Sequence, residues 1–239
     1  MSKNFELLQE AAKEKWFTPV GTPLRQLTPS PTPKRGPAKE EIAELVQRLF
    51  FHGGHKVVSF SGIECDDRSS WICARAGESL ASQADTSVCL VDANFGSPQQ
   101  LHTHLDAGNR TGLAAALTTE GPIRSFATPL SIGDLWLMPS GSAKGNLSRY
   151  AESCRTRFAE LRQEFGYVLI SAPPLTRETE ATLMGQLADG VVLIVEANQT
   201  RRESVRKAKE HLESAQVQLL GAVLDQRTFP IPEFLYRKL

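Results

Sequence analysis

The chain has no hydrophobic run long enough to cross a membrane. Its longest strongly apolar run is Val191–Val195, which is far shorter than the span of about 20 residues that a transmembrane helix needs. The N-terminus also lacks the apolar segment that directs secretion. We therefore expect a soluble, cytoplasmic protein that reaches a membrane only through a partner.

An excess of charge of either sign is also missing. Lys and Arg together number 27, and Asp and Glu together number 27, so the formal net charge is zero. That balance provides no general attraction to nucleic acid or to acidic lipid. The four cysteines form no CxxC pair, which favours reduced thiols in the core of a cytosolic protein.

The chain is divided into four parts by composition. Residues 1–17 predict a short amphipathic helix. Residues 18–37 contain six prolines and predict a flexible linker. The folded domain is expected over residues 38–228, and a short C-terminal tail over 229–239.

Apolar segments alternate with helical patterns throughout residues 38–228. The predicted strands are Lys56–Ser61, Val88–Asp92, Leu135–Met138, Tyr167–Ser171, Val191–Glu196 and Leu219–Leu224. The predicted helices cover 41–49, Ser69–Ser82, Leu113–Thr118, Arg149–Glu164, Glu178–Leu187 and Arg202–Ala215. Apolar strands that are each followed by a helix indicate a Rossmann-like α/β fold, with a mostly parallel twisted sheet between two helical layers. Ligands of such sheets bind at the carboxyl ends of the strands.

The loop after the first strand has the position of a phosphate-binding loop but not its composition. It reads SGIECDDRSS over Ser61–Ser70, whereas phosphate binding needs glycines, whose backbone N–H groups wrap the phosphates, and a cation. Each carboxylate of Glu64, Asp66 and Asp67 would repel a phosphate charge about 6 Å away by roughly 2–3 kcal/mol at an effective dielectric constant of about 20. The composition therefore indicates that the loop has lost its phosphate chemistry. Its three carboxylates form either a solvated acidic loop or a cation site.

Three segments in this order resemble the bacterial tyrosine autokinases of capsule and exopolysaccharide assembly, the CpsD/CapB type. They are the loop Ser61–Ser70, then Cys89–Pro98, then Tyr167–Pro174, and the resemblance spans residues 38–228. This family is part of the MinD/ParA-like group of deviant P-loop ATPases. The resemblance implies the P-loop NTPase fold, ATP and Mg²⁺ as cofactors, and a membrane-embedded polysaccharide co-polymerase or chain-length regulator as partner. It also allows a homo-oligomer at the inner face of the cell membrane.

The resemblance also assigns roles to particular residues. The positions that would bind the nucleotide are Gly62, Arg68, Ser69, Ser70 and Asp225. In an active member Ser69 and Asp92 would hold Mg²⁺, and Asp92 would be the catalytic acid that activates the acceptor hydroxyl. The alternative for Asp92 is an inherited strand-end residue that caps the next turn.

Several of these positions depart from the family pattern. The departures are Cys65 and Asp67 at the two loop glycines, Arg68 at the lysine, Gly96 and Ser97 at a pair of arginines, Ser171 at the third motif's aspartate, and Asp225 at the base-contacting asparagine. The family's C-terminal tyrosine cluster is also absent, since Tyr236 is the only tyrosine beyond Tyr167. Losses on separate catalytic elements favour a pseudoenzyme that serves as a regulatory or scaffold subunit. The alternatives are an active tyrosine autokinase and a MinD/ParA-like positioning ATPase.

Overall fold

The structure is a computed structural model. It describes residues 39–64, 67–95, 100–105, 107, 112–141 and 147–226. The predicted N-terminal helix, the linker and the C-terminal tail lie outside the described residues, as do Cys65, Asp66, Gly96, Ser97 and Tyr236. None of the helices within the described ranges is long and apolar enough to span a bilayer.

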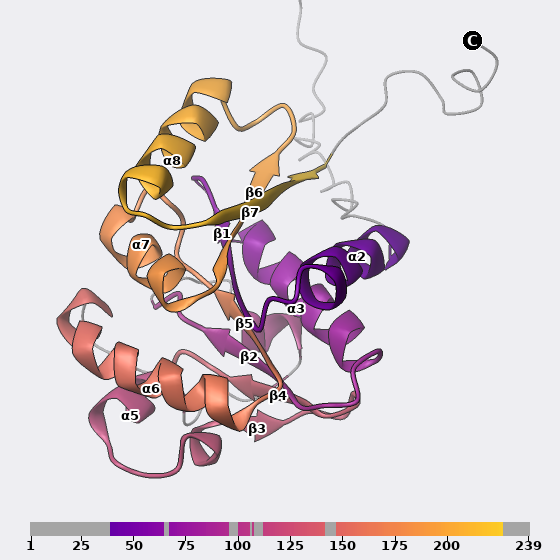
Figure 1. Cartoon of the computed structure of the whole chain (residues 1–239), viewed down its shortest axis with the longest axis vertical. Helices are drawn as coiled ribbons and strands as arrows, with labels where there is room; N and C mark the ends of the chain where they lie inside the picture. Colours follow the sequence, from indigo (N-terminus) through magenta and orange to yellow (C-terminus); the bar gives the residue numbers. More distant parts are fainter. Residues whose placement is uncertain are drawn as a thin grey trace, which may run out of the picture. The chain divides into compact units, whose positions relative to one another are not determined.

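A seven-stranded sheet forms the centre of the domain (Figure 1). In spatial order its strands are β3 (Thr128–Pro129), β4 (Leu135–Met138), β2 (Val88–Asp92), β5 (Tyr167–Ser171), β1 (Val57–Gly62), β6 (Gly190–Glu196) and β7 (Leu219–Asp225). Every neighbouring pair runs parallel except β3 with β4. The predicted mostly parallel α/β fold is confirmed.

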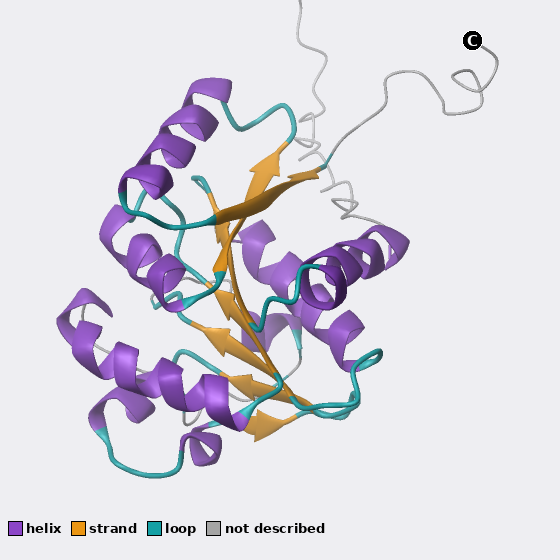
Figure 2. Cartoon of the chain, viewed as in Figure 1, coloured by secondary structure: helices purple, strands orange, loops and turns teal. Residues whose placement is uncertain are grey.

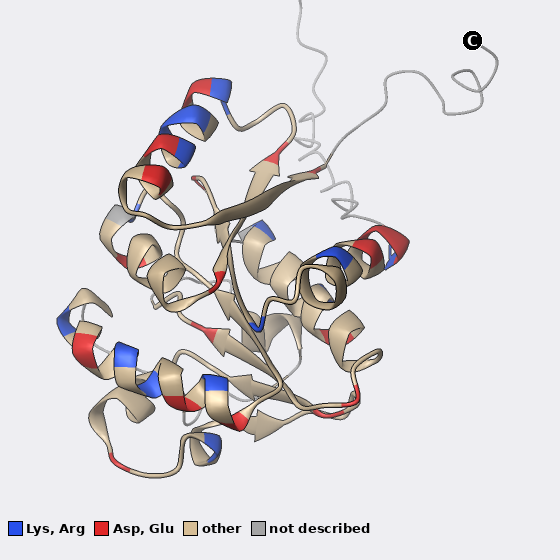
Figure 3. Cartoon of the chain, viewed as in Figure 1, with Lys and Arg blue, Asp and Glu red and all other residues tan. Residues whose placement is uncertain are grey.

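Helices cover both faces of the sheet (Figure 2). One face packs against α2 (Lys39–Val46), the π-helix η1 (Gln47–His52), α3 (Asp67–Ala81) and α4 (Leu101–His104). The other packs against α5 (Leu113–Thr118), the 3₁₀ turns η2 (Ile123–Phe126) and η3 (Leu147–Tyr150), α6 (Ala151–Glu164), α7 (Glu178–Leu187) and α8 (Arg202–Ser214). Charged residues of both signs are interspersed along α6 and α8, while the central strands carry few charged residues (Figure 3). The sheet therefore packs through apolar side chains against a layer of helices on each of its faces.

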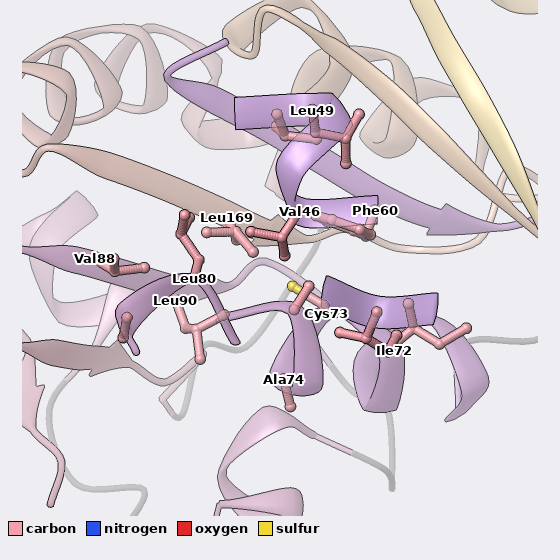
Figure 4. Packing of buried hydrophobic residues seen from close by; sticks show 14 of the residues in the cluster. Val46, Leu49, Phe60, Ile72, Cys73, Ala74, Leu80, Val88, Leu90 and Leu169 are labelled. Atoms are coloured by element: carbon pink, nitrogen blue, oxygen red, sulfur yellow. The ribbon is translucent and has the colours of Figure 1, made fainter. Parts of the chain in front are cut away.

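The core between α3 and the sheet is tightly packed (Figure 4). Every residue of β1 is buried, as expected for a central strand covered on both faces. Gly77 of α3 lies directly on β2, because a Cβ atom there would meet the Leu90 side chain at 2.7 Å. This close packing fixes where α3 begins relative to the strand ends.

The boundaries of the predicted elements agree with the structure to within about two residues, with one larger difference. The helix expected over 41–49 ends as α2 at Val46 and continues as the π-helix η1 to His52. A π-helix has no distinct signature in hydrophobic spacing. The sequence does not predict the short elements β3, α4 and η2. Each has too few residues for a periodic pattern of apolar side chains to be recognised.

An aspartate ties three elements together at the amino ends of the strands. The Asp189 carboxylate accepts hydrogen bonds from the backbone N–H groups of Lys56 (2.7 Å) and Val57 (2.8 Å) and from the Arg162 guanidinium (2.5 Å). Burial raises the pKa of the Asp189 carboxyl. The hydrogen bonds from Arg162 and the two N–H groups lower the pKa by more than burial raises it, so the pKa lies below its ordinary 3.8. Asp189 therefore stabilises the fold as a charged group.

Three cysteines lie within the core. Cys73, Cys89 and Cys154 are buried and not in disulfides. Burial raises the pKa of the Cys73 thiol well above its usual range, and the nearby Asp92 carboxylate raises it further. Burial also raises the pKa of Cys154 to about 11. Such thiols stay protonated at neutral pH and react slowly.

Candidate functional site

The carboxyl ends of the central strands and the first turn of α3 meet at one edge of the sheet. Arg68, in that first turn, donates from Nε to Oδ2 of Asp225, the last residue of β7. The two side chains are only 9% and 0% exposed. The Arg68 guanidinium carbon also lies 5.0 Å from the ring centre of Trp71. Two predicted nucleotide-binding residues therefore bind each other in a buried ion pair.

This ion pair does not use all the hydrogen-bonding capacity of its members. Nη2 of Arg68 and Oδ1 of Asp225 are both buried and have no hydrogen-bond partner among the described residues. Removing one member of a buried pair leaves an uncompensated charge and costs about 3–5 kcal/mol. Arg68 therefore cannot leave Asp225 without a compensating contact.

The second contact at this edge joins two serines. Ser70 of α3 and Ser171 of β5 lie with their hydroxyl oxygens 3.0 Å apart, and both residues are buried. Ser69 is buried in the same turn. By the resemblance, an aspartate at position 171 would hold Mg²⁺, a hard cation that favours anionic oxygen ligands. The serine pair is neutral, so it offers Mg²⁺ no charge.

Asp92 ends β2 beside Ser171 of β5, its partner in the sheet register. It is fully buried. Oδ1 accepts a hydrogen bond from the Asn94 N–H group (3.1 Å), and Oδ2 accepts one from the Leu101 N–H group (2.9 Å). This is the turn-capping geometry that the sequence left as the alternative to a catalytic role. The catalytic and Mg²⁺ roles of Asp92 remain predictions.

The beginning of the loop is bound to the segment after β5. The carbonyl of Gly62 accepts a hydrogen bond from the Leu175 N–H group (2.9 Å), and Ser61 Oγ donates to the Pro173 carbonyl (2.7 Å). Gly62, predicted to bind the cofactor, is thus buried with its carbonyl engaged within the protein. These contacts hold the first part of the loop in place.

The cavity at this edge is small. It measures about 80 Å³ and is lined by Ile63, Glu64, Arg68, Ile194, Glu196, Gln199 and Thr200. Sites for small molecules and cofactors usually measure about 300–1,000 Å³. A larger groove of about 490 Å³ lies between α5 and α6, and its lining contains none of the predicted site residues. Its buried Arg157 already donates to the carbonyls of Ala116, Thr119 and Gly121.

The structure brings most of the predicted residues together. Arg68 and Asp225 are in contact, and Ser69 and Ser70 adjoin them in the first turn of α3. Asp92 lies two strands from β1, with β5 between them. The sequence analysis missed Glu196 and Trp71. Glu196 is the last residue of the apolar strand β6, and this position at the carboxyl end was the available signal.

Comparisons with known proteins give a consistent group of relatives. No protein-family model matches the chain. It is 25% identical over 189 residues to the CapB protein of Staphylococcus aureus, covering 74% of this chain and 82% of that protein. It is 24% identical over 174 residues to tyrosine-protein kinase CpsD of Streptococcus agalactiae, covering 72% and 76%. A third similar protein is tyrosine-protein kinase YwqD of Bacillus subtilis, 27% identical over 146 residues, with 60% and 61% covered.

Solved structures share the same fold. The chimeric protein CapA2B2 matches with a TM-score of 0.72 and 24% identity, covering 83% of this chain and 88% of that one. The kinase domain of the Escherichia coli tyrosine kinase ETK matches with a TM-score of 0.72 and 19% identity, covering 82% and 79%. The cell-division ATPase MinD of Pyrococcus furiosus matches at 0.59 and 15%, covering 73% and 76%. The fold is therefore that of the P-loop ATPases.

Proposed function

Because the chain belongs to the family of bacterial tyrosine kinases that includes CapB and CpsD, we propose that it is a non-catalytic member. It serves as a regulatory or scaffold subunit in capsule or exopolysaccharide biosynthesis and export. One observation carries this proposal. Arg68, which replaces the phosphate-binding lysine, is held in a buried ion pair by Asp225, which replaces the base-contacting asparagine.

The ion pair opposes ATP binding energetically. To bind a phosphate, Arg68 would have to leave Asp225. The Asp225 carboxylate would then stay buried without a counter-charge, which costs about 3–5 kcal/mol. Each 1.4 kcal/mol is about tenfold in affinity, so the loss is a factor of roughly a hundred to several thousand. The carboxylate of Glu64, within the loop, would also repel a phosphate.

The metal-binding part of the site is weakened as well. Ser70 and Ser171 contact each other where the family would place Mg²⁺ between a hydroxyl and a carboxylate. Asp92, the remaining acid of the motif, already accepts two backbone hydrogen bonds. ATP and Mg²⁺, the cofactors of the family, are therefore not expected to bind tightly here.

The partner and the location that we propose are those of the family. The proposed partner is a membrane-embedded polysaccharide co-polymerase or chain-length regulator, which would recruit the chain to the inner face of the cell membrane. The formal net charge of zero supports recruitment by a protein rather than by acidic lipid. Direct binding to nucleic acid is not expected for the same reason.

Isothermal titration with ATP and Mg²⁺ tests the proposal, with tyrosine-protein kinase CpsD as the positive control. We expect no heat of binding up to millimolar ATP. A micromolar dissociation constant that is weakened in Arg68→Ala would refute the proposal, because it would show a working loop.

An active autokinase is the second candidate, and the retained, buried Asp92 is the observation that favours it. It predicts phosphate on Tyr150 or Tyr236 after incubation with ATP and Mg²⁺, and loss of that phosphate in Asp92→Asn. Incorporation that stays at background would reject it. A MinD/ParA-like positioning ATPase would instead dimerise when ATP is added, which size-exclusion chromatography with light scattering would detect.

A further inference from the structure

The outer edge of β7 is an uncovered strand edge in the part of the chain that the structure describes. β7 is the last strand in the spatial order and pairs there with β6 alone (Figure 1). It reads LLGAVLD, with no proline, no basic residue and no acid before its last position, although proteins usually protect an edge strand with such residues. Leu224 is 54% exposed, more than any other large apolar side chain among the described residues. This edge can therefore accept another strand.

The backbone groups of alternate residues of β7 point away from the sheet. The Asp225 carbonyl accepts a hydrogen bond from the Ala197 N–H group, directly after β6, at 2.8 Å. These directions alternate along a strand. Val223 therefore also pairs with β6, whereas the N–H and C=O groups of Ala222 and Leu224 point outward. Ala222 and Leu224 are also the two exposed residues of the strand, so the edge offers two donors and two acceptors.

The two faces of β7 differ beside this edge. The sheet register places Leu224 next to Val195 of β6, and Val195 packs against the core cluster that contains residues of α7 and α8. Leu224 thus extends an apolar surface to the edge. On the opposite face lies Gly221, where an added Cβ atom would meet no atom within 4 Å. A strand that pairs with β7 would find apolar contact on one face and open space on the other.

The segment that follows β7 has the sequence of an edge strand. It reads RTFPIPEFLYRKL over residues 227–239 and lies outside the described residues. Phe229 and Ile231 each precede a proline, which favours an extended backbone. Pro230 and Pro232 are two positions apart, so both would lack an N–H group on the same side of an extended chain. The N–H groups of Phe229 and Ile231 would point to the other side, which can therefore pair with a strand.

The end of β7 is compatible with a reversal of the chain. Gln226, the residue after the strand, has a φ of 57°, which is the left-handed conformation and ends an extended run. If Leu224 pairs with Phe229, residues 225–228 remain for the connection. Loops of four residues occur regularly in hairpins. Asp225 stays paired with β6 in this arrangement, and its side chain stays with Arg68.

We propose that residues 229–232 of this chain add to the sheet as an antiparallel edge strand on β7. Phe229 exchanges backbone hydrogen bonds with Leu224. Ile231 exchanges them with Ala222, so that all the outward groups of these two β7 residues gain a partner. The Phe229 side chain lies on the same face as Leu224 and covers it, as cross-strand neighbours do.

The same register gives the two prolines and the glycine a purpose. Pro230 and Pro232 turn their missing donors toward solvent, and a new edge that carries prolines resists the addition of a further strand. The Pro232 ring lies opposite Gly221, where the structure has open space. The new strand also leads the tail, including Tyr236, away from the carboxyl end of β7 and from the candidate site there.

Amide hydrogen exchange followed by NMR tests the proposal. The N–H groups of Ala222 and Leu224 should exchange about a hundredfold more slowly in the full chain than in a chain that ends at Gln226. The Val223 N–H group, which pairs with β6, should stay protected in both chains and is the internal control. Fast exchange of Ala222 and Leu224 in the full chain would overturn the proposal and leave the edge open to a different protein. Slow exchange that survives the truncation would overturn it as well.

A mixing experiment separates the chain's own tail from the tail of a second copy. An isotope-labelled chain that ends at Gln226 is incubated with an excess of the unlabelled full chain. We expect Ala222 and Leu224 of the labelled chain to stay unprotected, because the full chain's tail occupies its own β7. Protection of the labelled chain would assign the strand to a second copy and overturn the proposal.

Two tail variants test the register. Ile231→Pro keeps the segment extended but removes the N–H group that donates to Ala222, so the Ala222 amide should exchange about tenfold faster or more. Pro232→Ala changes a position that faces solvent in this register, and it should leave the exchange rates of Ala222 and Leu224 unchanged. A larger effect of Pro232→Ala than of Ile231→Pro would place the prolines on the paired side and overturn the assignment.

The added strand goes beyond the proposed scaffold function and does not depend on it. Hydrogen exchange reports on the edge of the sheet, whereas the ATP titration reports on the loop after β1. Either result can therefore fail without the other.

Discussion

Removing the charge of Asp225 should destabilise the domain more than removing both charges of its ion pair. Asp225→Asn keeps an oxygen that can accept from Arg68 Nε, but it leaves a buried guanidinium without an anion. Two unit charges about 4 Å apart interact by about 4 kcal/mol at an effective dielectric constant of about 20. Breaking a buried pair from one side costs about 3–5 kcal/mol. We therefore expect Asp225→Asn to lose about 3 kcal/mol or more.

The double variant Arg68→Met with Asp225→Leu should behave differently. It removes both charges and fills the space with apolar side chains, a replacement that is often neutral or stabilising for buried pairs. We expect its free energy of unfolding to lie within about 1 kcal/mol of the wild type. For a domain of this size 1 kcal/mol corresponds to about 2–4 °C in Tm, so Asp225→Asn should melt roughly 6–20 °C lower and the double variant nearly at the wild-type temperature.

Urea denaturation followed by far-UV circular dichroism at pH 7 measures these differences. Variants with equal m-values can be compared by their midpoints. The matched control is the exposed pair of Arg206 and Glu210, whose charged atoms are 3.7 Å apart, and Glu210→Gln there should cost less than about 1 kcal/mol. The reasoning is refuted if Asp225→Asn unfolds within about 1 kcal/mol of the wild type. It is also refuted if the double variant is less stable than Asp225→Asn.

Three further predictions concern other parts of the domain. Asp189 has a folded-state pKa below its ordinary 3.8, so its stabilisation is present above that pH and is lost as the pH falls through the folded value. Asp189→Asn should therefore lower stability at pH 7 and flatten its dependence below about pH 4, as urea denaturation at pH 7 and pH 3 would measure; equal slopes would contradict this. Cys73 and Cys154 should resist alkylation in the native state and react after unfolding, as peptide mass spectrometry would show, and rapid native labelling would contradict their burial. Ser171→Asp places a carboxylate in a fully buried position and should cost about 2 kcal/mol or more, and recovery of Tm on adding Mg²⁺ would indicate a surviving metal site.

Much of the fold could be predicted because the central strands are apolar along their whole length. β2 and β5 begin and end where their apolar runs do, since both are buried on both faces of the sheet. The short β3 could not be predicted, because Pro129 disfavours strand pairing and the strand exists only as an antiparallel edge on β4. α4 depends on Asp92 accepting the Leu101 N–H group, a contact between separate segments.

The candidate site was only partly predictable, for a related reason. Arg68 and Asp225 each appear in the sequence as a departure from the family pattern, and because they are 157 positions apart, the sequence does not show that they meet. Ser70 and Ser171 are 101 positions apart and present the same difficulty. Spacing along the chain indicates contacts within one helix or strand, but it carries no information on which strand end adjoins the first turn of α3.

These pairings distinguish a reshaped site from a damaged one. A chain that had lost only the lysine, or only the asparagine, would hold an arginine or an aspartate buried without a counter-charge, at a cost of several kcal/mol. Here the arginine and the aspartate neutralise each other. Likewise, the hydroxyl of Ser171 meets the hydroxyl of Ser70 instead of leaving a buried carboxylate without a cation. Each replacement is therefore compatible with its neighbour, and this compatibility supports the non-catalytic function proposed for this chain.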